Sequence, residues 1–169
     1  SKVDEEYICK NVFIGKTDVS GMTKEEAVKA VDNTLGDYRN KQLVLKVKDQ
    51  GADVSIEEMG AEVENIDKLA EKAVGYGKNG SIWSRYQKIH NLDKKKYVID
   101  ESFKVDEAKL RELIQERAVP LEQKAVNASA SYNGSGFDLT DEAEGYTVDV
   151  DKSVKKIKNF MNKKWNYED

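Results

Sequence analysis

GADVSIEEMGAEVE (Gly51 to Glu64) and GFDLTDEAEGYTVD (Gly136 to Asp149) are two versions of one pattern, and this pattern predicts the fold. Sliding the sequence along itself by 85 residues superimposes the two segments without a gap. The identical positions are Gly51/Gly136, Asp53/Asp138, Glu57/Glu142, Gly60/Gly145 and Val63/Val148. A repeated pattern of this kind predicts one supersecondary unit that is built twice and packed against its copy.

The first copy contains a helix, two strands and a second helix. Thr23 and Glu26 have the spacing of a capping box at the start of a helix. Gln42 to Lys48 alternates between apolar and polar residues, and a turn signal leads to a partner strand around Asp53 to Ile56. The apolar spacing that begins at Ile66 predicts the second helix.

The second copy repeats this order. Lys96 to Phe103 predicts a strand, and Val105 to Val119 predicts a helix with Asp106 as its N-cap. Ala125 to Tyr132 and Phe137 to Thr140 flank a tight turn and predict a hairpin. The last helix is expected to face the core with Val154, Ile157, Phe160 and Met161. The whole predicts an α+β fold of two related helix–β-hairpin–helix units, an internal duplication with antiparallel strands packed on helices.

These elements divide the chain into five parts. We expect a flexible N-terminal segment at residues 1–10, a first α+β repeat at 11–75, a connecting segment with a short helix at 76–95, a second repeat at 96–164 and a tail at 165–169. The glycine-punctuated connector is expected to lie at the seam between the two repeats.

Composition excludes several classes of protein. The chain has 169 residues, 36% of them charged, and a formal net charge of −4, which argues against a nucleic-acid partner. One cysteine leaves no intrachain disulfide, and no stretch approaches the ~20 apolar residues of a membrane span. With one His and one Cys, we expect no metal site and no cofactor. The chain begins in a charged run, as a trimmed piece would, so a membrane anchor would lie outside it.

Catalysis has two weak candidates in the sequence. Cys9 and His90 are the residue types of a nucleophile–base pair, but nothing in the sequence orients the histidine. Glycosidases use two carboxylates, and the sequence offers the pairs Glu57-Glu58, Glu142 with Glu144, and Asp149 with Asp151. Glu57 and Glu142 occupy equivalent places in the repeat, so duplication explains them without chemistry. We therefore expect no enzyme activity.

Three signatures carry a resemblance to a known family. They are VFIGKTDVSGMTKEEA (Val12 to Ala27), AVGYGKNGS (Ala73 to Ser81), and the order Val105-Asp106, Pro120, Ala125, Gly145 and Val148-Asp149 in the second half. In this order the chain resembles the peptidoglycan-binding domain family found N-terminal to L,D-transpeptidase domains and in vancomycin-resistance-associated W-type proteins of Gram-positive bacteria. The resemblance covers nearly all of Asn11 to Met161 and implies peptidoglycan as a ligand and an extracellular, cell-surface location.

The chain departs from the pattern of these proteins at two points. The family shows an aromatic-Gly-Arg-x-Gly motif where this chain has YGKNG, so Lys78 stands in the arginine position. An L,D-transpeptidase catalytic domain needs Cys in a His-Gly-Cys context, whereas Cys9 lies in YICKN and His90 in KIHNLD. The transpeptidase motif is absent, and a catalytic domain of a parent protein would follow Asp169.

The connector supplies the candidate binding site. Its glycines permit positive φ and close backbone approach, while its cations would meet stem-peptide carboxylates and its aromatic rings would stack on sugars. The candidate ligand-binding residues are Tyr76, Gly77, Lys78, Gly80, Trp83, Arg85 and Tyr86. Two other interpretations stay open. The segment is a plain turn whose aromatic side chains fill the core, or Lys78 and Arg85 pair with acids of the second copy and fix the orientation of the lobes.

Three functions remain for such a chain. The first is a non-catalytic extracytoplasmic cell-wall module that binds peptidoglycan or positions an adjacent wall-modifying domain. The second is a structural spacer or protein–protein interaction domain of a membrane-anchored surface protein. The third is a hydrolase that uses the repeated acids.

Overall fold

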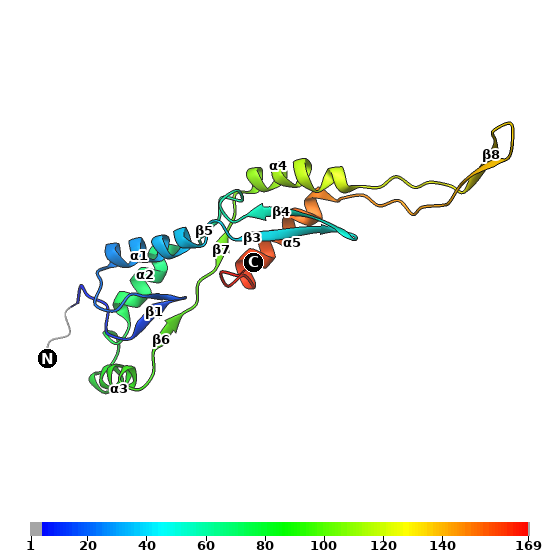
Figure 1. The fold of residues 1–169 in the computed structure, drawn as a ribbon. Helices are drawn as coiled ribbons and strands as arrows, with labels where there is room; N and C mark the ends of the chain where they lie inside the picture. The colour runs from blue at the N-terminus through cyan, green and yellow to red at the C-terminus, as the bar shows by residue number, and fades with distance from the viewer. Residues whose placement is uncertain (1–4, 169) are drawn as a thin grey trace.

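Five α-helices and four small sheets follow one another along residues 5–168, the part of the chain that the computed structural model describes (Figure 1). The helices are α1 (Lys24–Asp37), α2 (Ile66–Gly75), α3 (Ile82–Leu92), α4 (Glu107–Arg117) and α5 (Val150–Lys163), with a short 3-10 turn at Val119–Leu121. The strands are β1 (Val12–Ile14), β2 (Thr17–Asp18), β3 (Gln42–Val47), β4 (Gln50–Ser55), β5 (Glu62–Val63), β6 (Tyr97–Ile99), β7 (Phe103–Lys104), β8 (Ser129–Tyr132) and β9 (Phe137–Thr140). This mixture confirms the α+β class.

The capping box at the start of α1 is present as expected. The Glu26 backbone N–H donates to Thr23 Oγ1 over 3.3 Å, and the Thr23 N–H donates to the Glu26 carboxylate over 3.0 Å. These two bonds satisfy donors that the first helical turn leaves free. α1 then buries Ala27, Val31 and Leu35 and packs along α2.

The sheets join the two halves of the chain. β1 pairs with β2 in antiparallel fashion and with β6 in parallel fashion, which differs from the all-antiparallel expectation. β5 pairs with β7, so the segment predicted as one strand at Lys96 to Phe103 is instead two strands in two sheets. Between Ile99 and Phe103 the chain leaves the sheet that contains β1 and enters the sheet that contains β5. The alternation of apolar and polar residues along a segment does not show that it passes from one sheet to another.

The β3–β4 hairpin covers helices of the second half. Cross-strand pairs such as Leu43↔Val54 and Leu45↔Ala52 put apolar side chains on one face, where Val54 is fully buried. This face packs against the core beside α4 and α5 (Figure 1). The first-half hairpin and the second-half helices therefore depend on each other for burial.

An ion pair holds this hairpin to α4. The Arg117 guanidinium donates to the Asp53 carbonyl over 2.7 Å and to Glu58 Oε2 over 3.0 Å. The Glu58 carboxylate also accepts the Ser55 backbone N–H over 2.8 Å. The hydrogen bond from Arg117 and those from Ser55 lower the pKa of Glu58 to about 2. The charged carboxylate is thus the form that the fold stabilises.

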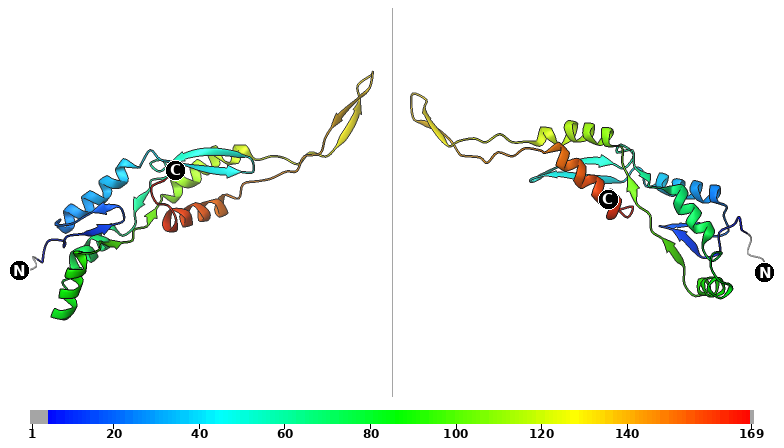
Figure 2. Two further views of the ribbon diagram at one scale, coloured as in Figure 1. Left: turned by 60° about the horizontal axis from the view of Figure 1, so that its bottom comes forward. Right: turned by 180° about the vertical axis from the view of Figure 1, so that it is seen from behind.

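Within residues 5–168, no helix packs against the β8–β9 hairpin. It lies at the tip of two extended segments that project from the body of the molecule, as all three views show (Figures 1 and 2). Both of its strands are exposed along their whole length. Bridges at Gln123↔Tyr146 and Val126↔Ala143 join the two extended segments.

The C-terminal residues belong to the core. Trp165 and Tyr167, which lie in the expected tail, are buried with their rings 4.6 Å and 5.1 Å from that of Phe103. Ile8 is also buried, although residues 1–10 were expected to be flexible. Residues 1–4 of that segment and residue 169 of the tail lie outside the described part of the chain. Phe160 was expected to face inward and is instead exposed, while its neighbour Met161 takes the buried position.

The structure does not confirm the duplication. Both halves have the order helix, hairpin, helix, but Val54 is buried and its counterpart Leu139 is 77% exposed. The paired glycines also differ. Gly60 has a positive φ of +61°, a conformation that favours glycine. Gly145 does not have a positive φ, and a side chain there is excluded by close packing, because a Cβ would lie 2.5 Å from the Ala125 nitrogen. The likeness between the halves therefore remains a prediction from sequence.

The two tryptophans offer a matched test of this core. We expect Trp165→Ala to lower the free energy of unfolding by about 3 kcal/mol or more, because Trp165 is 6% exposed and packs on Phe103. Trp83→Ala should change it by less than about 0.5 kcal/mol, because Trp83 is 68% exposed. Urea denaturation followed by circular dichroism measures both. Equal losses for the two variants would contradict the position of Trp165 in the core.

The Glu58–Arg117 pair predicts a pH effect on stability. The pKa of Glu58 is lowered in the folded state, so its contribution is present above about pH 4.5 and is lost as the pH falls toward 2. Glu58→Gln should therefore lose less stability than the wild type between pH 6 and pH 3. Both side chains are about a third exposed, so screening limits the difference to at most about 1 kcal/mol.

Urea titrations at the two pH values measure this difference. Glu57→Gln is the control, because Glu57 is exposed and adjacent but does not contact Arg117. A wild type and a Glu58→Gln variant with parallel pH profiles would refute the assignment.

Candidate ligand-binding surfaces

Helix α3 follows the glycine-rich connector and carries half of the predicted site. Gly77 and Gly80 have φ angles of +78° and +102°, which favour glycine, and Ser81 then caps the helix by accepting the Ser84 N–H over 3.2 Å. The helix lies at the end of the molecule opposite β8–β9 (Figures 1 and 2). The connector therefore does not lie at a seam between lobes, contrary to expectation.

Tyr76 and Lys78, which belong to the predicted site, contact other parts of the fold and do not point freely into solvent. The Tyr76 ring stacks on Tyr97 with centroids 3.8 Å apart, and burial raises the pKa of its hydroxyl. The Lys78 ammonium donates to the backbone carbonyls of Glu5 and Tyr7. The proposed pairing of Lys78 with acids of the second half is therefore wrong, and Lys78 instead ties down the N-terminal segment.

The remaining residues of the predicted site face solvent. Trp83 and Tyr86 are exposed, with ring centroids 6.0 Å apart and planes at 22°. Tyr86 and His90 continue the row at 5.9 Å and 2°. We call Trp83, Tyr86 and His90 the α3 aromatic row. His90 was missed as a member, although its position four residues after Tyr86 puts it on the same helical face.

Basic residues lie on the same helix as this row and directly after it. Arg85 and Lys88 are half-buried on α3, and three exposed lysines, Lys94 to Lys96, follow the helix directly. Arg85 has no ion pair with any residue in the described range 5–168. The Asp93 carboxylate is the nearby anion, and Lys10 pairs with it and lowers its pKa. The surface is thus aromatic and mainly basic.

A second surface was not anticipated. A groove of about 420 Å³ runs between β3 and α5, and we call it the β3–α5 groove. Its apolar lining is Leu45, Val47, Ile114, Ala118 and Ile157, and its lysines are Lys46, Lys48, Lys152 and Lys156. The Lys48 ammonium lies 5.8 Å from the centroid of Tyr146, which also lines the groove. Its two walls are about 100 residues apart in sequence, so no local pattern could reveal it.

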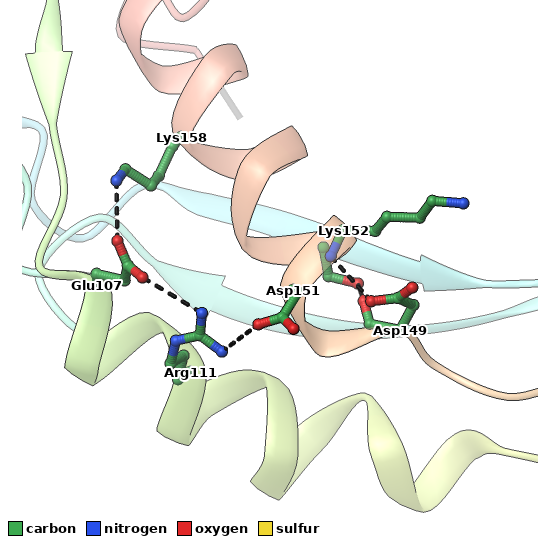
Figure 3. A network of polar contacts seen from close by, with 7 residues as sticks. Glu107, Arg111, Asp149, Asp151, Lys152 and Lys158 are labelled. Carbon is green, nitrogen blue, oxygen red and sulfur yellow. Dashed lines mark hydrogen bonds and ion pairs between the residues drawn. The ribbon is translucent and has the colours of Figure 1, made fainter.

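A polar network beside the groove fixes α5 against α4. Glu107 accepts from the Lys158 ammonium over 2.9 Å and from the Arg111 guanidinium over 3.3 Å (Figure 3). Arg111 also donates to Asp151 over 2.7 Å. Lys158 and Arg111 lower the pKa of Glu107. Asp149 caps α5 by accepting the Lys152 backbone N–H over 3.0 Å.

The acids and the thiol that sequence analysis weighed for catalysis do not gather in a site. Glu57 lines a shallow polar groove with Lys104 and Lys109, whereas Glu142 is exposed on the projecting segment. The Cys9 thiol donates to the Tyr76 carbonyl over 3.5 Å. Within residues 5–168, no group of three or more His, Cys, Asp or Glu side chains is placed to hold a metal ion.

None of the helices described is long and apolar enough to cross a bilayer.

Comparison with known proteins identifies the family. Neither a curated protein nor a solved structure matches the chain. The family model "Putative peptidoglycan binding domain" matches residues 52–169, from the middle of β4 to the C-terminus. The match contains α3 with its aromatic row but not the first signature at Val12 to Ala27. Because the match covers well over half of the sequence, this chain belongs to the peptidoglycan-binding domain family.

Proposed function

We propose that this chain is a non-catalytic, extracytoplasmic module that binds peptidoglycan through the α3 aromatic row. The observation that carries the proposal is the row itself, in which Trp83 and Tyr86 are 68% and 60% exposed. Large aromatic side chains seldom gather on a surface without a partner. The row lies within the residues that match the peptidoglycan-binding family.

The chemistry of the row suits a glycan with peptide stems. Sugar rings have apolar faces that gain contact by lying on aromatic rings, and the polar edges of Tyr and Trp remain free to hydrogen-bond. Stem peptides carry carboxylates, and Arg85, Lys88 and Lys94 to Lys96 supply cations beside the row. The surface thus offers aromatic contact for the sugar and opposite charge for the peptide.

A shallow surface is sufficient for a polymeric ligand. Two or three rings give weak affinity at one site, but peptidoglycan repeats its sugar units many times. When sites are linked, later binding events occur at a raised effective concentration. The module would therefore hold its protein near the wall, outside the cytoplasm, and position an adjacent wall-modifying domain without a deep cleft.

Binding to purified peptidoglycan sacculi tests the proposal. We expect the Trp83→Ala, Tyr86→Ala double variant to bind about tenfold more weakly than the wild type, which corresponds to about 1.4 kcal/mol. Tyr132→Ala should lose less binding than this double variant, because Tyr132 is equally exposed but lies on β8 at the other end of the molecule, away from the row. Lys78→Ala should also bind normally, because its ammonium faces the backbone of Glu5 and Tyr7.

The readout is the bound fraction after sedimentation of the sacculi, at several protein concentrations. Retention that does not saturate, or an equal loss for the α3 double variant and Tyr132→Ala, would overturn the role of the row. A spacer or protein-interaction domain would remain as the alternative function, which the projecting β8–β9 hairpin favours.

A further inference from the structure

The β8–β9 hairpin and its two connecting segments form a projecting arm, which we define as residues 123–146. From Glu122 to Glu142 every residue except Gly136 is exposed. A two-stranded hairpin is marginally stable at best in water unless something packs against it. The arm therefore lacks, among the residues that the structure describes, the cover that such a structure needs.

One face of the hairpin is built for burial. The cross-strand pairs Ala130↔Leu139 and Tyr132↔Phe137 lie on one face, and Ser129↔Thr140 and Ser131↔Asp138 lie on the other. Tyr132, Phe137 and Leu139 are 67%, 68% and 77% exposed. Such clean alternation is typical of an antiparallel sheet with one solvated face and one covered face.

The β3–β4 hairpin shows what covers a face of this kind. The shift of 85 residues places Phe137 on Ala52 and Leu139 on Val54. Ala52 and Val54 lie on the face of β3–β4 that packs beside α4 and α5. By this correspondence, the apolar face of the arm is suited to the same two helices.

The β3–α5 groove leaves part of that helix surface open. Five consecutive residues, Val44 to Lys48, line the groove. Successive residues of a strand point to opposite faces of the sheet, so a consecutive run means that the edge of β3 borders the groove, and not one face alone. These five residues make no backbone hydrogen bond outside the β3–β4 ladder within residues 5–168. A free edge beside an apolar floor accepts an added strand.

The charges of arm and groove are opposite. Lys46, Lys48, Lys152 and Lys156 line the groove together with one acid, Asp149, and Asp141, Glu142 and Glu144 lie on the arm together with one lysine, Lys124. Two arms packed on each other would bring their acids together, whereas an arm in the groove pairs acids with lysines. Charge therefore favours the groove as the seat of the arm.

We propose that the arm of one molecule docks in the β3–α5 groove of a second copy, with Phe137 and Leu139 on the apolar floor and the arm's acids facing the lysines. The arm and the β3–β4 turn point in the same direction, away from the body (Figures 1 and 2). Two molecules that approach head-on in opposite directions can thus exchange arms. The exchange closes a two-fold dimer, because each copy gives one arm and offers one groove.

This association goes beyond peptidoglycan binding and does not use the same surface. The α3 aromatic row lies at the opposite end from the arm, so the dimer leaves both rows exposed. A dimer with two rows would engage the wall polymer at two points.

Sedimentation equilibrium of the 169-residue chain over a wide concentration range tests the dimer. We expect reversible dimerisation that the Phe137→Ser, Leu139→Ser double variant weakens by tenfold or more. The matched control is Ser131→Ala, Thr140→Ala, on the opposite face of the same hairpin, which should dimerise like the wild type. A monomer at all concentrations, or equal loss from both faces, would overturn the proposal.

Charge reversal gives a sharper test. Replacing Lys46, Lys48, Lys152 and Lys156 together by Glu reverses the charge of the groove, and replacing Asp141, Glu142 and Glu144 together by Lys reverses that of the arm; all seven side chains are exposed, and circular dichroism checks folding. Each variant alone should be monomeric, because its arm and groove then carry like charge. A mixture of the two should form a heterodimer, because each arm meets a groove of opposite charge.

The outcomes separate this inference from peptidoglycan binding. Failure of the mixture to associate would overturn arm exchange, whatever the sacculi show. Both monomeric variants should lose the second point of wall contact equally, so weaker sacculus binding by the groove variant than by the arm variant would also overturn it, because the groove would then serve the wall ligand. Loss of sacculus binding in the α3 double variant alone, with dimerisation intact, would support both proposals.

Discussion

The apolar face of a two-stranded hairpin has to be covered, and the rest of this structure depends on how that requirement is met. β3–β4 meets it by crossing to the helices of the other half, where Val54 is fully buried. Arg117 reinforces the contact through the Asp53 carbonyl and the Glu58 carboxylate. Because the first-half hairpin shields second-half helices, neither half can bury its apolar surface alone.

The same requirement separates the molecule into a packed middle and two exposed ends. Phe103, Trp165 and Tyr167 pack edge to face in the middle, and Tyr167 also contacts Tyr38 just after α1. At one end, α3 exposes an aromatic row among cations. At the other, the arm exposes an apolar face among acids. The two ends differ in shape and charge, which is consistent with two different partners, a wall polymer and a second copy of the chain.

Local signals in the sequence predicted most elements but few of their partners. The Thr23–Glu26 capping box, the β3–β4 turn and the Asp106 cap depend on neighbouring residues, and all three are present. The split of the segment 96–103 into β6 and β7, and the β3–α5 groove, depend on contacts between distant residues. Tyr76 and Lys78 of the predicted site serve the fold instead, because the Tyr76 ring stacks on Tyr97 and the Lys78 ammonium donates to the backbone carbonyls of Glu5 and Tyr7. These partners lie far from Tyr76 and Lys78 in the sequence, so no local pattern predicts them.

The comparison of Val54 with Leu139 explains why sequence likeness and unequal burial can coexist. An apolar residue at such a position predicts that one face of the hairpin is covered, but it does not predict which element or molecule covers it. For Val54 the cover is α4 and α5 of the same chain. Leu139 is the counterpart of Val54 in the sequence repeat and has no cover within residues 5–168. A cover supplied by another molecule satisfies both facts, since it preserves the pattern and leaves the isolated chain with an exposed face.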